Sequence, residues 1–135
     1  MANNVENFQQ SLSHRFADLE LLKQALTHRS AEKNNNERFE FLGDSLLGFV
    51  VAELLYQEFP GASEGELSRM RASMVSKPAL AAIARQLELG SFLRLGSGEL
   101  NSGGSARDSI LSDAVEAIIA AIYLDGGIEA CKEQV

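Results

Sequence analysis

The sequence predicts an all-α fold with helices packed around one long central helix. Apolar residues recur at helical spacing through long stretches, above all in residues 36–59 and 107–124. No segment shows the strict apolar–polar alternation of a half-buried strand. With 135 residues, 45% of them apolar, the chain is long enough for one globular domain with a sizeable core.

The first half of the chain predicts three helices. Residues 5–12 and 19–27 form two short ones, and a polar connector from Lys33 to Asn35 follows. Residues 36–59 form one long helix, which Pro60 and Gly61 end. Gly43 and Gly48 inside it each cost about 1 kcal/mol against alanine. We therefore expect another backbone to pack closely against them.

The second half predicts further helices with clear start signals. Ser63 and Glu66 have the spacing of a capping box, which starts a helix that runs through Val75. Pro78 starts the next helix, which ends at Gly90. Residues 92–95 are a brief element and residues 96–104 a glycine- and serine-rich loop. Residues 107–124 and 128 onward are the last two helices.

Three acids interrupt the apolar pattern of the long helix. Glu37, Glu40 and Asp44 stand at i, i+3 and i+7, so they lie on neighbouring turns of one face. Glu40 and Asp44 share a stripe with Leu47 and Val51, and we expect that stripe to point toward the interior. Carboxylates aimed at an interior are costly unless something neutralises them.

A second acidic pair opens the next long apolar run. Asp113 and Glu116 are again i, i+3, and Ala117, Ala120 and Ala121 beside them let another helix approach closely. Two facing helices would bring four carboxylates to one site. All-oxygen ligation suits magnesium or manganese. Without a metal, four clustered carboxylates would repel and raise one another's pKa.

The acids also have structural interpretations. Asn34 precedes Glu37 by three residues, the spacing of a capping box, and Ser105 precedes Asp108 in the same way. The second acidic pair lies too far inside its helix for capping. An acidic pair on an apolar face is often a buried salt bridge, and the candidate partners are Arg38, Arg69, Arg71 and Arg107.

Residues 36–47 read Asn-Glu-Arg-Phe-Glu-Phe-Leu-Gly-Asp-Ser-Leu-Leu and resemble the signature motif of the ribonuclease III family. Residues 113–117, Asp-Ala-Val-Glu-Ala, resemble that family's second acidic motif. Four further segments are also similar to the family: residues 26–30, 64–72, 87–90 and 95–104. The resemblance covers nearly the whole chain in order and departs at no metal-binding position.

The resemblance implies an all-α, dimeric hydrolase of the cytoplasm, an endonuclease for double-stranded RNA. It implies dependence on magnesium, for which manganese substitutes, and products with 5′-phosphate and 3′-hydroxyl ends and short 3′ overhangs. Roles in processing ribosomal and messenger RNA precursors are implied too. By motif position the metal-binding acids are Glu40, Asp44, Asp113 and Glu116, with Asp44 and Glu116 nearest the chemistry, and the accessory acids near RNA are Glu37 and Glu64.

Charge and composition bound this reading. A net charge of −7 argues against a free-standing nucleic-acid binder. Bound cations reverse the local sign, and family members usually carry a separate double-stranded-RNA-binding domain after the catalytic one. We expect residues 1–135 to be a catalytic domain, truncated within a helical pattern, with that second domain absent from this chain. Cys131 is the only cysteine, and no apolar run reaches the roughly 18 residues of a membrane span.

Phe41 lies about 100° from Glu40 on a helical wheel and so falls outside the acidic stripe. We expect it to insert into a partner across a two-fold homodimer, as matching positions in the family do. The alternative is packing against a helix of its own chain.

Other candidates keep two interpretations each. Residues 96–104 are a surface connector or a contact for the RNA backbone. His28 either bonds a carbonyl at a helix end or lies near RNA. Arg69, Arg71 and Lys77 form a solvated face or hold phosphates. Two other function classes compete with the nuclease: a non-catalytic RNA-binding relative, and a di-iron helical protein, whose Glu-x-x-His pairs this sequence lacks.

Overall fold

The computed structural model describes residues 5–135, and the regular structure within them is helical apart from one isolated bridge between Thr27 and Arg94. The all-α prediction is confirmed. The helices are α1 Val5–Gln9, α2 Leu19–Ala25, α3 Glu37–Glu58, α4 Glu64–Met74, α5 Lys77–Gln86, α6 Ser97–Asn101 and α7 Asp108–Gln134, with 3₁₀ turns η1 Leu89–Phe92 and η2 Gly104–Ala106.

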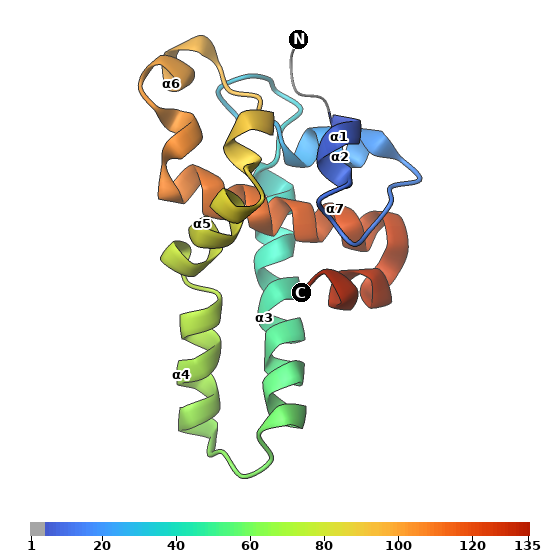
Figure 1. Cartoon of the computed structure of the whole chain (residues 1–135), viewed down its shortest axis with the longest axis vertical. Coiled ribbons are helices and arrows are strands. Elements are labelled where there is room, and N and C mark those ends of the chain that lie inside the picture. Colours follow the sequence, from blue (N-terminus) through green and yellow to red (C-terminus); the bar gives the residue numbers. More distant parts are fainter. Residues whose placement is uncertain (1–4) are drawn as a thin grey trace.

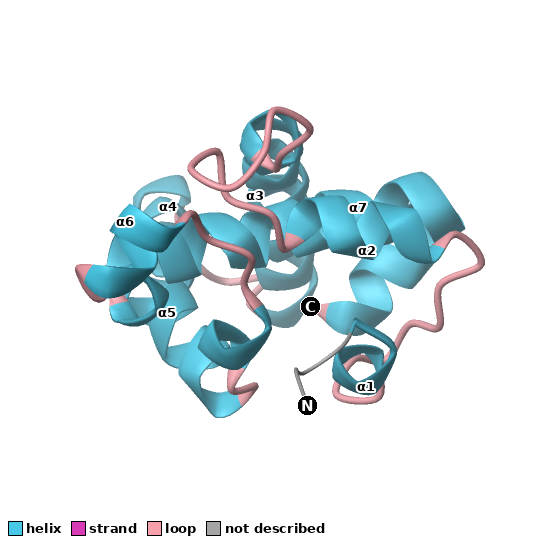
Figure 2. Cartoon of the chain, turned by 90° about the horizontal axis from the view of Figure 1, so that it is seen from above, coloured by secondary structure: helices cyan, strands magenta, loops and turns pink. Residues whose placement is uncertain are grey.

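Two long helices organise the molecule. α3 runs along its long axis, α7 crosses α3 near its beginning, and α4 returns beside the other half of α3 (Figure 1). Seen from above, α5 and α6 lie toward one end of α7 and α1 and α2 toward the other (Figure 2). The predicted central helix α3 therefore shares the centre with α7, which is buried almost all round over residues 110–122.

The crossing depends on a missing side chain. A Cβ atom added to Gly43 would lie 1.7 Å from the carbonyl oxygen of Glu116, so only glycine lets the two backbones meet there. The prediction of close backbone packing at Gly43 is confirmed. At Gly48 it is wrong, because nothing lies within 4 Å of the added Cβ.

Several helix ends agree with the sequence signals. The Ser63 hydroxyl accepts from the Glu66 amide, and the Glu66 carboxylate accepts from the Ser63 amide, which completes the predicted capping box. The predicted break between the last two helices is a kink inside α7 at Gly127, whose φ of 85° favours glycine. The predicted loop 96–104 is partly wrong, since it contains α6 and the start of η2.

An acidic clamp ties the N-terminal segment to the far end of α7. The Asp125 carboxylate bonds the His14 ring nitrogen Nε2 at 2.7 Å. It also accepts from the backbone amides of Ala17 and Asp18 at 2.9 Å each. These three bonds hold the connection between α1 and α2 against α7, just before its kink at Gly127. Asp113 and Glu116 lie earlier on α7, near its start.

Candidate metal centre

The crossing of α3 and α7 brings the predicted acids together. One carboxylate oxygen from each of Glu40, Asp113 and Glu116 lies within 4.8 Å of the others. Asp44 lies one turn after Glu40, near enough to Glu116 to help raise the pKa of that carboxyl. Asp44 is exposed rather than turned inward as expected, and the other three are half-buried. We refer to these four residues as the acidic cluster.

Local contacts fix the start of α3, which carries half of the cluster. The buried Asn36 side chain donates to the Ala25 carbonyl at 3.0 Å, and its backbone amide donates to the Thr27 carbonyl at 2.9 Å. These bonds hold the beginning of α3 on the end of α2. Glu40 follows one turn later and therefore projects at the point where α7 crosses.

Arg107 holds the start of α7, the helix that carries the other two acids of the cluster. Its guanidinium donates to the Glu99 carboxylate at 2.8 Å and to the Ser102 carbonyl at 3.1 Å. The segment before α7 is thereby joined to α6. Asp113 and Glu116 follow on the next two turns, and Gly43 lets Glu116 come close to α3.

The cluster carries more negative charge than its surroundings neutralise. Burial, followed by the neighbouring Asp44, raises the pKa of Glu116 to about 8. Burial, followed by the charge of Asp113, raises the pKa of Glu40 to about 7. Burial also raises the pKa of Asp113, although the charges of Lys77, His28 and Arg29 oppose that rise. A bound cation would neutralise the charge of these carboxylates and so remove the cause of their raised pKa values.

The buried salt-bridge interpretation is wrong. Within residues 5–135, no lysine or arginine nitrogen lies within 4.0 Å of a carboxylate oxygen of the cluster. Arg107, one of the proposed partners, pairs with Glu99 instead. Among the described residues, the acids of the cluster therefore form no direct ion pair with a lysine or arginine.

The donor set fits a hard divalent cation. Three carboxylate oxygens within 4.8 Å of one another can reach one ion, because magnesium–oxygen distances of about 2.1 Å place ligand oxygens roughly 3–4 Å apart. Carboxylates suit magnesium, calcium or manganese. The grouping contains no histidine or cysteine among the described residues, which argues against zinc and against the di-iron alternative.

A polar hollow of about 300 Å³ opens beside the cluster. Glu40 and Asp113 form part of its lining, and the remaining charged side chains around it are Glu37, Glu99, His28, Arg29 and Arg107. The hollow therefore places carboxylates and cationic groups around one space that a charged substrate can enter.

The predicted accessory acids lie in different places. Glu37 lines the hollow, and Arg29 Nη1 lies 3.3 Å from its carboxylate. The Glu37 amide is capped by Asn35 at 3.0 Å, so the predicted Asn34 cap is wrong. Glu64 begins α4, beyond the end of α3 that is remote from α7 (Figure 1). Since α3 rises 1.5 Å per residue, the stretch from Glu40 to its end spans about 27 Å.

The predicted cap at the start of α7 is also wrong. No side chain caps that helix, and Asp108 instead accepts from Arg85 Nη2 at 2.6 Å. Ser105 belongs to η2. Both predicted helix caps are therefore wrong. Asp113 and Glu116, the acids of the second motif, lie further along α7 where it faces α3.

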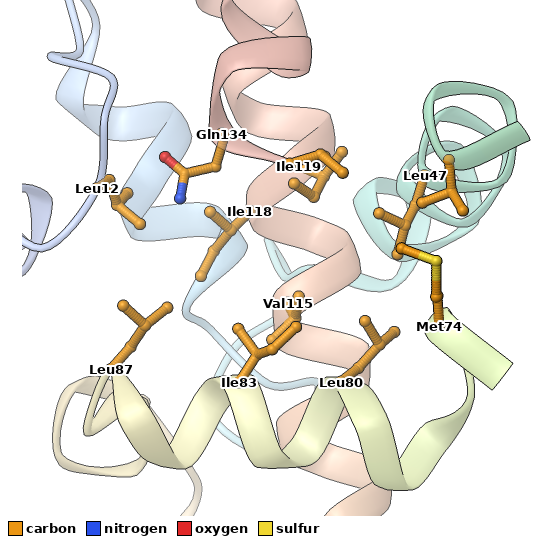
Figure 3. Close-up of a pocket in the computed structure, with 12 residues that line it drawn as sticks. Leu12, Leu47, Met74, Leu80, Ile83, Leu87, Val115, Ile118, Ile119 and Gln134 are labelled. Carbon is orange, nitrogen blue, oxygen red and sulfur yellow. The ribbon is translucent and has the colours of Figure 1, made fainter. Parts of the chain in front are cut away.

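A second hollow lies between α5, α7 and α3 and differs from the first in chemistry. Its volume is about 140 Å³, and its lining is apolar except for Gln134. Figure 3 shows Leu80 and Ile83 of α5, with Leu87 directly after it, facing Val115 and Ile118 of α7 across the hollow. The lining contains no acid, histidine or thiol side chain, so it offers no groups for hydrolysis.

Phe41 points away from its own chain. Its side chain is 78% exposed, so the alternative in which it packs within the chain is wrong. Phe49 and Tyr56, which the sequence analysis missed, are 52% and 73% exposed. At 100° per residue the three aromatics fall within about 80° of one another on α3. We call these residues the aromatic stripe; their spacing of seven or eight residues was the available signal.

A model of the Ribonuclease-III-like family matches residues 18–135. The chain belongs to the ribonuclease III family. It is 60% identical over 131 residues to Ribonuclease 3 of Glaesserella parasuis, which covers 97% of this chain and 59% of that protein. It is 61% identical over 132 residues to Ribonuclease 3 of Methylococcus capsulatus, over 98% of this chain and 57% of that protein. The chain thus spans less than two thirds of the curated relatives it matches.

Solved ribonuclease III structures share the fold. The nuclease domain of ribonuclease III from Campylobacter jejuni superposes with a TM-score of 0.93 at 49% identity, over 96% of this chain and 92% of that one. Dicer from Pichia stipitis superposes with a TM-score of 0.66 at 28% identity, over 86% of this chain and 49% of that one. Among the described helices, none has the length and apolar character needed to cross a membrane.

Proposed function

We propose that this chain is the catalytic domain of a divalent-metal-dependent endoribonuclease that hydrolyses phosphodiester bonds in double-stranded RNA. The main support for the proposal is the grouping of Glu40, Asp113 and Glu116 where α3 and α7 cross. One carboxylate oxygen from each of them lies within 4.8 Å of the others. Membership of the ribonuclease III family supports the reaction class.

The residues of the cluster have distinct tasks in this reaction. Glu40, Asp113 and Glu116 would hold magnesium, with manganese able to substitute, and the neighbouring Asp44 would orient the Glu116 carboxyl. A bound divalent ion supplies a more acidic water, stabilises charge on phosphorus and assists the leaving oxygen. Because the pKa of Glu40 is raised to about 7 and that of Glu116 to about 8, binding of a cation near neutral pH would release protons from these carboxyls. Asp44 and Glu116 are the acids we place nearest the chemistry.

Duplex RNA is the substrate we infer, with 5′-phosphate and 3′-hydroxyl products. A net charge of −7 opposes binding to phosphates, so affinity should be low and fall steeply with salt. A double-stranded-RNA-binding domain elsewhere in the full protein would supply the missing affinity. A cytoplasmic location and the processing of ribosomal and messenger RNA precursors belong to the same proposal.

Cutting both strands of a duplex requires two sites at a fixed separation, which a two-fold homodimer provides. The aromatic stripe on α3 is the surface that supports such a dimer, with Phe41 as its most exposed member. The related Campylobacter jejuni structure concerns flexibility in a region involved in dimer formation of its nuclease domain. If two α3 helices pair antiparallel, the Glu64 end of one copy comes beside the other copy's cluster, which accounts for Glu64 as an accessory acid.

Cleavage of a perfect RNA duplex tests the proposal directly. At low salt with magnesium the chain should cut the duplex weakly, and chelation should stop the reaction. Single-stranded RNA and a DNA duplex of the same sequence are the controls. Equal cleavage of all three, or cleavage that persists in a chelator, would overturn the proposed substrate and cofactor.

A further inference from the structure

The turn that follows α2 is held rigidly beside the polar hollow. The His28 amide donates to the Arg94 carbonyl at 2.9 Å, and the Gly96 amide donates to the Ser30 hydroxyl at 2.9 Å. A Cβ atom on Gly96 would lie 2.2 Å from the Ser30 carbonyl oxygen, so the two backbones are in direct contact. The Ser30 amide also donates to His28 Nδ1 at 3.1 Å. The backbone on both sides of Arg29 is therefore fixed.

The Arg29 side chain is accessible although its backbone is fixed. It is 70% exposed, and within residues 5–135 its one side-chain ion pair is the 3.3 Å hydrogen bond from Nη1 to Glu37, itself 56% exposed. Exposed ion pairs of this kind contribute little to stability. A guanidinium has five N–H donors, so most of those on Arg29 remain available to a further acceptor.

Arg29 also faces the acidic cluster. It lines the same hollow as Glu40 and Asp113. Its positive charge also opposes the rise in the pKa of Asp113. Arg107 lines the hollow too, but it already serves Glu99 and Ser102 with three bonds. Of the two arginines that line this hollow, Arg29 therefore has more free donors.

We propose that Arg29 forms a phosphate-binding subsite beside the acidic cluster, which receives the RNA phosphate adjoining the scissile one. Glu37 holds the guanidinium in place until RNA arrives and then competes with the phosphate for it. Planar, bidentate recognition of phosphate is what arginine does best. The proposal rests on the proposed function, because it places the substrate strand over the cluster. It makes Arg29 a binding residue and Glu37 a positioning residue.

Binding and cleavage of a short RNA duplex separate this subsite from a structural ion pair. Duplex affinity is measured across a range of salt concentrations with calcium in place of magnesium, and KM and kcat are measured with magnesium. Arg29→Ala should raise Kd and KM about 10-fold, leave kcat within about twofold, and reduce the salt slope of log Kd by about 1. Arg29→Lys should restore part of the affinity, and Glu37→Gln should lower KM.

Arg15→Ala is the matched control, since Arg15 is exposed and lines none of the hollow; it should leave KM and slope unchanged. An Arg29→Ala variant that lowers the melting temperature but keeps the wild-type KM and salt slope would overturn the subsite alone. Suppose instead that the wild-type chain binds the duplex without cutting it, and that Arg29→Ala reduces the salt slope of log Kd by about 1. This result would overturn the proposed reaction and keep the subsite. A wild-type chain that neither binds nor cuts duplex RNA would overturn both.

Discussion

The substitution Gly43→Ala should separate the two halves of the candidate metal site. The added Cβ would start 1.7 Å from the carbonyl oxygen of Glu116, whereas real Cβ atoms essentially never come within 3.0 Å of another heavy atom. The backbones must therefore part by about 1.3 Å, the difference between these distances. The obstructing atom belongs to a helix backbone, so no side-chain rotation can relieve the clash.

The magnitude follows from two competing terms. Alanine gains about 1 kcal/mol of helix propensity over glycine, and overpacking usually costs about 1–3 kcal/mol, more where nothing can yield. Because the Glu116 carbonyl is part of a helix backbone and cannot yield, we place the overpacking cost at about 3–4 kcal/mol. The free energy of unfolding should therefore fall by about 2–3 kcal/mol once the gain in helix propensity is subtracted. Because catalytic constellations tolerate shifts of only about 0.5 Å, and a misplacement of about 1 Å can cost 100-fold, duplex cleavage should fall at least about 100-fold.

The matched control lies on the same helix. Gly48→Ala puts a Cβ where nothing lies within 4 Å, so it should raise stability by up to about 1 kcal/mol and leave cleavage unchanged. Denaturant unfolding and initial cleavage rates measure both quantities. A Gly43→Ala variant that unfolds and cleaves like wild type would refute the claim that contact between α3 and α7 backbones sets the geometry of the cluster.

Three further predictions concern the acidic cluster, the aromatic stripe and the Asp125 clamp. The raised pKa values of Glu40 (about 7) and Glu116 (about 8), against an ordinary 4.5, mean that the folded metal-free protein holds protons which the unfolded chain releases. Its thermal stability should therefore fall as pH rises from about 4.5 to 8 and recover with magnesium; a rise over that window in chelator would contradict this. Phe41→Ala should stay folded but shift toward monomer in sedimentation, whereas a wild-type chain that is monomeric at micromolar concentration would reject the dimer. Asp125→Ala removes three hydrogen bonds and should lower the free energy of unfolding, measured by denaturant titration, by about 3 kcal/mol. A loss below about 0.5 kcal/mol would show that the clamp is unimportant.

The parts of the fold that could be predicted depend on local chemistry. Ser63 and Glu66 satisfy each other's backbone within one turn, and Gly127 lies where the predicted break between helices falls. The acidic pairs on α3 and α7 were also readable, since each pair stands at helical spacing at the head of an apolar run. Their meeting at one point could be inferred only because isolated carboxylates on such faces are costly.

The parts that could not be predicted depend on contacts between distant segments. Nothing near Arg29 in the sequence marks it as lining the same hollow as Asp113. Its place is set by hydrogen bonds between its neighbours and a distant segment: the His28 amide donates to the Arg94 carbonyl, and the Gly96 amide donates to the Ser30 hydroxyl. Glu64 lies in one of the segments similar to the family, yet it begins α4 beyond the end of α3, and the stretch of α3 from Glu40 to that end spans about 27 Å. Gly48 looked equivalent to Gly43, and only the path of α7 distinguishes them.

The replacement Glu116→Gln tests the central claim most directly, when manganese binding by calorimetry and magnesium-dependent duplex cleavage are measured on the same folded sample. Glutamine keeps the size of the side chain and removes its charge. We predict that the wild-type chain binds the ion and cuts the duplex. The variant should unfold at a similar or higher temperature in chelator while losing both manganese binding and cleavage. A variant that binds manganese and cleaves at wild-type levels would contradict the assignment of Glu40, Asp113 and Glu116 as one catalytic metal site.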